Sequence, residues 1–293
     1  MSHKLRFLLA SAVGFAFLAE PALAGPGDPS GVGDPVDKGK PGKPGKKGGK
    51  KGKNKKEYVG PIKKANYPQE IRLRPLTMAK GMVEGELGLD YTAVPNNFGG
   101  VAVKTPDPIG LGLGFSYGLA PTVDVRVSSG LALSPSFDWS NQLGLGVGYL
   151  AYDTRDFDMA LRLDLGLQLV TGGTIGVALS APMRYLLGDT FDIHGSVSIP
   201  VFLDPVFYLA LSVNPGVGVQ ASEAVYLSLD TTLFTVGSVA GTTTTLGNFL
   251  PVAFSATYAI DEQWDIGARL GSSNLLQTDV NGFNIGVFGR GRF

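Results

Sequence analysis

Charged side chains recur at every second position in several segments of the chain, where they would share one side of an extended strand. Fifteen side chains, His194 included, are therefore candidates for the chemistry of the protein: Glu84, Glu86, Asp90, Asp124, Arg126, Arg162, Asp164, Arg184, Asp192, His194, Asp230, Asp265, Arg269, Arg290 and Arg292. Carboxylates and guanidiniums confined to a narrow interior must pair, because an isolated charge removed from water is costly. We expect ion pairs with water between them.

His194 is the one histidine that follows the first 24 residues, and Asp192, Ser196 and Ser198 alternate with it. Hydroxyl, imidazole and carboxylate groups are the parts of a hydrolytic relay. Residues two apart on one strand are separated by about 6–7 Å, which is too far for a good relay. We therefore interpret His194 as a lone polar histidine. The chain also has no cysteine, HExxH, GxSxG or phosphate-binding glycine loop, so we expect no enzyme, metal or cofactor.

Period-two alternation is what positions these side chains. Between residues 159 and 169 every odd position is Met or Leu, and the even positions are Ala, Arg, Asp, Gly and Gln. This pattern predicts strands with one apolar and one polar face. Twelve segments of this kind cover roughly residues 81–92, 108–118, 122–133, 141–151, 158–170, 174–186, 191–202, 206–219, 224–236, 248–260, 264–272 and 281–293.

The strand lengths and connectors favour a membrane barrel over a soluble β-sandwich. Segments of about ten to fourteen residues are near the length that a tilted strand needs to cross a bilayer, whereas sandwich strands are usually about five or six residues long. Short connectors near residues 119–121, 187–190, 220–223 and 261–263 alternate with longer ones near 93–107, 237–247 and 273–280. We predict an all-β fold, a closed antiparallel up-and-down transmembrane barrel of about twelve strands spanning residues 67–293.

Aromatic residues and prolines refine this prediction. Two groups of outward aromatic residues would lie at the two membrane interfaces: Tyr117, Tyr149, Tyr185, Phe191, Tyr258, Trp264 and Phe293 at the turn side, and Tyr91, Phe207 and Phe283 at the loop side. Prolines lie within four segments, at Pro182, Pro200, Pro215 and Pro251. Because proline cannot donate to a strand ladder, we expect bulges there.

The N-terminal quarter is of a different kind. Residues 1–24 have basic residues, then an apolar run from Phe7 to Leu18, then an Ala-Leu-Ala cleavage site, the order of a secretory signal peptide. Residues 25–66 are rich in Gly, Pro and Lys and have little to bury, so we expect a disordered arm. Its residues 25–64 carry a charge of +8, against −9 for residues 65–293. Attraction of opposite charges predicts that the arm enters or covers the periplasmic mouth.

The last segment, Phe283–Phe293, resembles the closing strand of bacterial outer-membrane β-barrel proteins. Phe293 matches their terminal aromatic residue, and Val287 and Ile285 match the alternating apolar positions before it, whereas Gly289 and Gly291 depart from them. The resemblance implies a porin-like barrel of a Gram-negative bacterium, recognised at Phe293 by the barrel-assembly machinery. It also implies outer-membrane lipid around the barrel, with the arm and the C-terminus in the periplasm.

Two functions follow from these features. A small-residue lining in a twelve-stranded barrel predicts a narrow water-filled pore for passive or weakly selective passage of small hydrophilic solutes. The alternative is a structural or adhesive envelope protein without significant transport, whose basic arm binds an anionic periplasmic polymer. We expect no nucleic-acid partner, because an exported chain rarely meets nucleic acid.

Overall fold

The computed structural model describes residues 67–93, 97–98, 101–102, 107–134, 138–154, 156–168, 174–203, 207–239, 242–245, 250–276 and 282–293. The predicted signal peptide and the basic arm, residues 25–66, lie outside these ranges. No helix in the described residues is long and apolar enough to cross a membrane.

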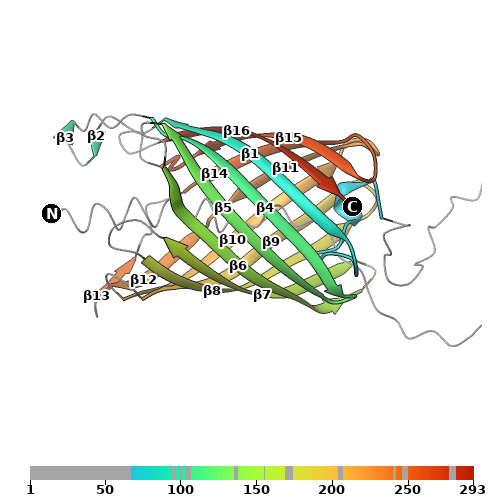
Figure 1. Cartoon of the computed structure of the whole chain (residues 1–293), viewed down its shortest axis with the longest axis horizontal. Helices are drawn as coiled ribbons and strands as arrows, with labels where there is room; N and C mark the ends of the chain where they lie inside the picture. Colours follow the sequence, from blue (N-terminus) through green and yellow to red (C-terminus); the bar gives the residue numbers. More distant parts are fainter. Residues whose placement is uncertain are drawn as a thin grey trace, which may run out of the picture.

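Twelve antiparallel strands form the wall of a closed barrel, which confirms the predicted fold (Figure 1). These strands are β1 (Val83–Ala93), β4 (Ile109–Ala120), β5 (Val123–Ser134), β6 (Asp138–Asp153), β7 (Phe157–Gln168), β8 (Thr174–Leu187), β9 (Phe191–Phe202), β10 (Tyr208–Gln220), β11 (Val225–Thr231), β14 (Val252–Ala259), β15 (Trp264–Ser272) and β16 (Phe283–Arg292). The remaining elements are η2 (Ile71–Leu73), β2 (Asn97–Phe98), β3 (Val101–Ala102), β12 (Phe234–Val239) and β13 (Thr242–Thr245). Each wall strand pairs with the wall strands before and after it in the chain, so every edge is covered.

The first and last strands close the barrel. β16 pairs with β1 from Glu84 opposite Arg292 to Ala93 opposite Phe283. Beyond this ladder, Val83 N donates to Phe293 O over 2.9 Å, and Phe293 N donates to Val83 O over 2.8 Å. The C-terminus and the start of β1 therefore lie at the same end of the barrel as η2, and we call this end the turn-side mouth (Figure 1).

The alternation predicted from the sequence divides the wall into two faces. Outward apolar side chains are about half exposed, as at Leu87 (52%), Leu163 (53%) and Ile266 (52%), whereas the neighbouring inward Asp124 and Asp265 are buried. Such a continuous exposed apolar surface is unfavourable in water and favourable in hydrocarbon. The aromatic residues predicted for the turn side are also outward and exposed: Tyr117, Tyr149, Tyr185, Phe191, Tyr258, Trp264 and Phe293. The three predicted for the loop side, Tyr91, Phe207 and Phe283, are exposed too.

The ninth predicted strand, residues 224–236, is divided in two. β11 pairs with the second half of β10, beginning at Asp230 opposite Gly216. β12 pairs with the first half, beginning at Phe234 opposite Val213, so one additional residue has entered the strand between these pairs. This is a bulge, and it lets β12 and β13 continue beyond the end of β11 as a hairpin (Figure 1).

The prediction of bulges at the prolines is wrong for Pro182, Pro200 and Pro215, and it stays a prediction for Pro251, which lies just before the paired residues of β14. Pro182, Pro200 and Pro215 lie opposite Ser196, Ala178 and Gly195 without a shift of register. Each proline lacks a donor toward only one neighbouring strand, so the ladder on its other side keeps the alignment. The irregularities described for β4 to β7 instead lie near residues 109–110, 118–120, 130–132 and 150–152.

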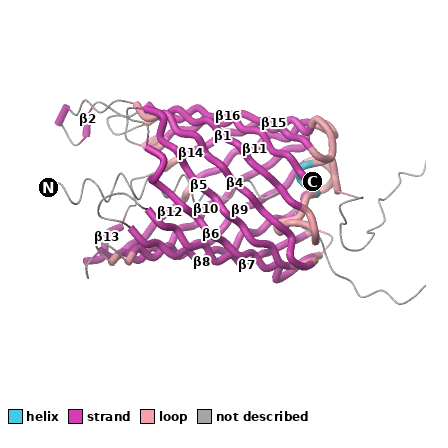
Figure 2. The backbone as a smooth tube through the Cα atoms, in the orientation of Figure 1, coloured by secondary structure: helices cyan, strands magenta, loops and turns pink. Residues whose placement is uncertain are grey.

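The most important departure from the prediction is at residues 67–82. The sequence grouped this segment with the barrel domain but predicted no strand before about residue 81, and it gave no position for the residues before that strand. The structure shows that they cross the turn-side mouth before β1 begins. Its apolar side chains Tyr67, Ile71, Leu76, Met78 and Met82 are all buried. Figure 2 shows its one turn of helix, η2, in cyan at the end of the barrel where the C-terminus lies. We call residues 67–82 the mouth segment.

Candidate functional site: the barrel lumen and its mouth segment

All fifteen candidate side chains alternate with the outward apolar residues of their strands. They fall into three neighbourhoods: Glu84, Glu86, Asp90, Asp265, Arg269, Arg290 and Arg292 on β1, β15 and β16; Asp124, Arg126, Arg162 and Asp164 on β5 and β7; and Arg184, Asp192, His194 and Asp230 on β8, β9 and β11. The alternation thus places them on the inner wall. Their role as pore charges stays a prediction, which conductance measurements would test.

In the first neighbourhood the charged side chains form a row of ion pairs across β1, β16 and β15. Arg290 Nε lies 2.5 Å from Glu86 Oε2, and Arg292 Nε lies 2.7 Å from Glu84 Oε2. Arg292 Nη2 also lies 2.7 Å from Asp265 Oδ2. The register explains the first two contacts, because Glu86 is opposite Arg290 and Glu84 is opposite Arg292. The third is diagonal, because Asp265 is opposite Arg290 and pairs with Arg292 two residues farther along β16. Pairing satisfies these buried charges.

In the third neighbourhood His194 is not a lone histidine, because both of its ring nitrogens have carboxylate partners. Its Nδ1 lies 2.6 Å from Asp192 Oδ1, and its Nε2 lies 2.8 Å from Asp230 Oδ1. The distance argument from the strand rise is therefore wrong, because side chains at i and i+2 can lean toward each other. Tyr226 completes the group and donates its hydroxyl to Asp192 over 3.1 Å. An imidazolium, which donates from both nitrogens, satisfies this arrangement.

The sequence missed several polar residues that share the lumen. Asp158 on β7 forms an ion pair with Arg184, and both are buried. Arg72 and Arg74 belong to the mouth segment and are buried as well. Asp158 has inward parity and could have been found by the alternation, whereas the mouth segment has no such pattern.

The mouth segment is fastened first by Arg74, which is fully buried. Its Nη1 forms an ion pair with Asp265, the same carboxylate that Arg292 engages. Its Nε and Nη2 donate to Pro68 O (3.0 Å) and Gln69 O (2.9 Å), which fixes the turn of the segment itself. Arg74 therefore both shapes the mouth segment and joins it to β15.

Tyr67 lies between two guanidiniums at this point. The Cζ atoms of Arg292 and Arg74 lie 5.3 and 5.6 Å from the centre of its ring. Burial raises the pKa of the Tyr67 phenol, although Arg292 and Arg74 act in the opposite direction. A neutral aromatic ring under two cations is a favourable cation–π arrangement.

Further hydrogen bonds fasten the segment around the ring of strand ends. Arg72 N donates to Gln220 Oε1 (3.2 Å), and Arg72 Nη1 donates to Gly188 O (3.1 Å). At the far side, Met78 N donates to Asp124 Oδ2 over 3.0 Å. Gly81 N donates to Gly118 O over 2.8 Å, so the segment meets β4 just before β1 begins.

Apolar contacts support the polar ones. Leu76 packs with Leu150 of β6 and Ala160 of β7. Ile71 packs with Tyr226 and Ala259. The mouth segment therefore has a small core of its own inside the turn-side mouth, against strands on opposite sides of the barrel.

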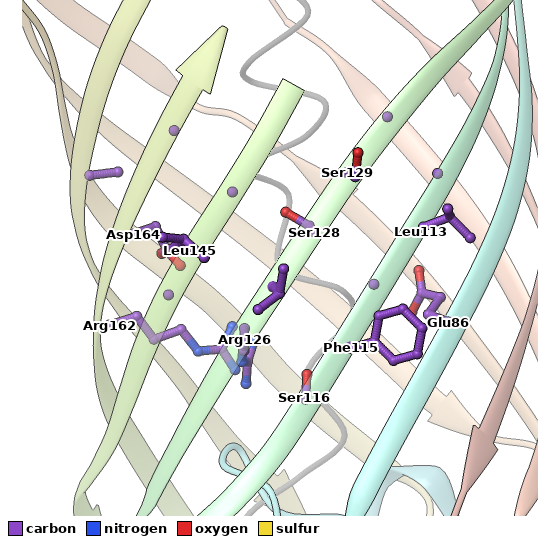
Figure 3. Close-up of a pocket in the computed structure, with 18 of the residues that line it drawn as sticks. Glu86, Leu113, Phe115, Ser116, Arg126, Ser128, Ser129, Leu145, Arg162 and Asp164 are labelled. Carbon is purple, nitrogen blue, oxygen red and sulfur yellow. The ribbon is translucent and has the colours of Figure 1, made fainter. Parts of the chain in front are cut away.

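Above the mouth segment the lumen widens into a cavity of about 290 Å³. Small polar side chains form much of its lining: Ser116, Ser128, Ser180, Ser196, Ser198 and Asn214. Glu86 and Asp90 lie on one wall, and Arg126, Arg162 and Asp164 lie on another. Figure 3 shows Arg126 and Arg162 pointing toward each other, with Asp164 beside them.

A row of glycines on β6 leaves space for the side chains of Arg126, Arg162 and Asp164. Gly144, Gly146 and Gly148 face the lumen, and a Cβ at Gly146 would lie 2.3 Å from Asp164 Oδ1. A Cβ at Gly148 would lie 2.2 Å from Asp124 Oδ1. The side chains of β5 and β7 therefore lean over β6 and meet above it.

Comparison with known proteins supports the fold alone. No protein-family model and no curated protein matches the chain. Among solved structures, the COG4313 outer membrane channel from Pseudomonas putida F1 is 12% identical with a TM-score of 0.54, and the match covers 74% of this chain and 97% of that one. The NanC porin is 10% identical (TM-score 0.49; 69% of this chain and 98% of that one). A KdgM porin in complex with disordered oligogalacturonate is 8% identical (TM-score 0.48; 71% and 99%). The chain has the fold of outer-membrane β-barrels.

Proposed function

We propose that the chain is a channel of the Gram-negative outer membrane that admits small hydrophilic solutes, with the arm and the C-terminus in the periplasm. The observation that carries the proposal is a wet, polar cavity inside a barrel whose outer face is apolar. An exterior of this kind suits lipid, and a lumen lined by serine, glycine and paired charges suits water and small solutes.

In this structure the proposed channel has its mouth segment in place. It occupies the turn-side mouth, so solutes that enter the cavity from the loop side meet its residues and the arginines that hold it. Passage then requires the mouth segment to move, as a gate. Its attachments are ion pairs and hydrogen bonds to separate strands, and such contacts can break while the barrel wall stays closed.

Conductance tests this proposal. The mature chain, residues 25–293, is folded in detergent and inserted into a planar bilayer. We expect discrete openings of small conductance, separated by closed periods in which the mouth segment is in place. A folded barrel that stays silent at all voltages, including in variants that weaken the mouth segment, would contradict the proposal.

The filled mouth also favours a second candidate. A barrel that never opens would be a structural or adhesive protein, and its arm, with twelve Lys against four acidic residues in residues 25–64, would bind an anionic envelope polymer. Outer-membrane lipid and the barrel-assembly machinery are partners under either proposal. Co-sedimentation of the protein with an anionic polymer, lost on deletion of residues 25–64, together with bilayer silence would favour this candidate.

Neither proposal includes a catalytic step. The ring nitrogens of His194 lie against two carboxylates rather than against a serine hydroxyl. We expect His194→Ala to leave any lipid hydrolysis by the purified protein unchanged. A hydrolytic rate that falls to background in this variant would overturn that expectation.

A further inference from the structure

Arg162 is a buried guanidinium with an unusual shortage of partners. Its exposed fraction is only 4%, yet it lines the lumen cavity. Within the described residues, no carboxylate oxygen lies within 4.0 Å of its nitrogens, and its one hydrogen bond is from Nη2 to Leu76 O over 2.7 Å. Its Nε is buried without a hydrogen-bond partner in the same part of the chain. Buried arginines are usually paired, because a charge without a partner is costly to bury.

Arg126 reaches the same point from the neighbouring side of β6. Its Nη2 donates to Asp124 Oδ2 over 2.9 Å and to Leu76 O over 3.3 Å, while its Nε has no partner among the described residues. The two guanidiniums therefore converge on one carbonyl oxygen of the mouth segment, Leu76 O. Figure 3 shows the two side chains next to each other. Arg126 has the Asp124 carboxylate as its counterion. A backbone carbonyl carries only a partial charge, so it is a weak counterpart for Arg162.

The surroundings suit a small anion. Ser116 lies opposite Arg126 in the ladder, and Ser180 lies opposite Arg162, so hydroxyls flank the pair on both sides. Asp164 lies on the same wall, and its carboxylate would oppose a dianion more strongly than a monoanion. The cavity, about 290 Å³, has room for a ligand of a few carbon atoms with its water.

We propose that Arg126 and Arg162 form a binding site for a small monocarboxylate on the cavity floor, and that binding there releases the mouth segment. A carboxylate accepts paired hydrogen bonds from a guanidinium and is a stronger acceptor than a carbonyl. It would take the donors that now hold Leu76 O. The ligand would thus loosen the segment that blocks its own way out of the cavity.

This inference rests on the proposed channel function, but it can be tested without conduction. The chain has no cysteine, so Thr77→Cys gives a single thiol in the mouth segment beside Leu76. Thr77 is buried, and its hydroxyl has no partner in the described residues, so the replacement is mild. The rate at which a maleimide labels this thiol in detergent reports how often the segment leaves the mouth.

We expect sodium lactate to accelerate labelling in a saturable manner, whereas glycerol and sodium chloride at the same concentration do not. Arg162→Gln should weaken the lactate response by about tenfold or more, the effect of losing a hydrogen bond to a charged group. Arg162→Lys, which keeps a cationic donor, should recover part of the response. Lys80→Gln is the matched control: it removes an exposed cation from the same mouth segment, outside the cavity, and should leave the response unchanged.

A labelling rate that does not depend on lactate, or that chloride raises equally, would overturn the site. The same conclusion would follow if Arg162→Gln kept the full lactate response. Loss of channel openings in the bilayer experiment, with lactate binding intact, would instead refute the channel function and leave the site standing.

Discussion

Arg74→Ala should loosen the mouth segment without unfolding the barrel. Among the described residues the guanidinium makes three hydrogen bonds and a cation–π contact with Tyr67. The cation–π contact and the hydrogen bonds to Pro68 O and Gln69 O lie within the segment, so they can persist when the segment moves. Only the ion pair with Asp265 joins it to the wall. After the substitution Asp265 keeps its contact with Arg292 at 2.7 Å, so no carboxylate is left buried alone.

The magnitude follows from that one contact. A hydrogen bond to a charged group contributes about 1.5–3 kcal/mol, which corresponds to a roughly 10- to 150-fold rise in the ratio of released to seated segment. Single-channel recording measures this ratio as open probability. Lys80→Ala is the control, because Lys80 belongs to the same segment but is exposed and engages β4 only through its backbone.

The refuting result is equally specific. If Arg74→Ala and Lys80→Ala give the same open probability, while both barrels remain folded by their heat-modifiable mobility on gels, the ion pair does not hold a gate. The description of the mouth segment as a moving closure would then have to be abandoned.

Three further predictions concern the arm, the wall and the last strand. Deleting residues 25–64 should change conductance at low salt and have little effect at high salt, because attraction between the arm and the barrel is screened; equal currents at low salt would count against the arm at the mouth. Gly118→Ala should destabilise the folded protein by about 1–3 kcal/mol, since its Cβ would lie 2.1 Å from the backbone oxygen of Ala79. A thermal midpoint unchanged from the native protein would contradict this. Phe293→Ala should lower the amount of folded barrel recovered from membranes, because it removes the terminal aromatic residue. The substitution also removes the edge contact between the rings of Phe293 and Trp264, whose centres lie 5.4 Å apart. A normal yield would exclude an assembly role.

The barrel could be predicted from the sequence because its physical cause is local. A strand between lipid and water must alternate, so the side chains themselves record which face they occupy, as Leu163 and Asp164 do. The two girdles of exposed aromatic residues followed from the same parity. The strand count needed only the number of alternating segments.

What could not be predicted depends on contacts between distant residues. The mouth segment is short and has no periodicity, so nothing in its own pattern shows that Arg74 meets Asp265 or that Leu76 meets two arginines. Its one signal was the return of apolar residues such as Ile71, Leu76 and Met78, interspersed with charged ones, between a polar arm and the first alternating strand. The contact between His194 and Asp192 was missed because the spacing of backbone atoms says little about where side chains lean.

The central claim is that solutes pass through the lumen when the mouth segment leaves it. Leu76→Cys with Ala160→Cys tests this directly, because the two side chains pack together and the chain offers no other thiol. We predict that the oxidised protein, with its segment tied to β7, is silent in a planar bilayer and that reduction of the disulfide restores discrete openings. Equal currents before and after reduction, or silence in both states, would contradict the account.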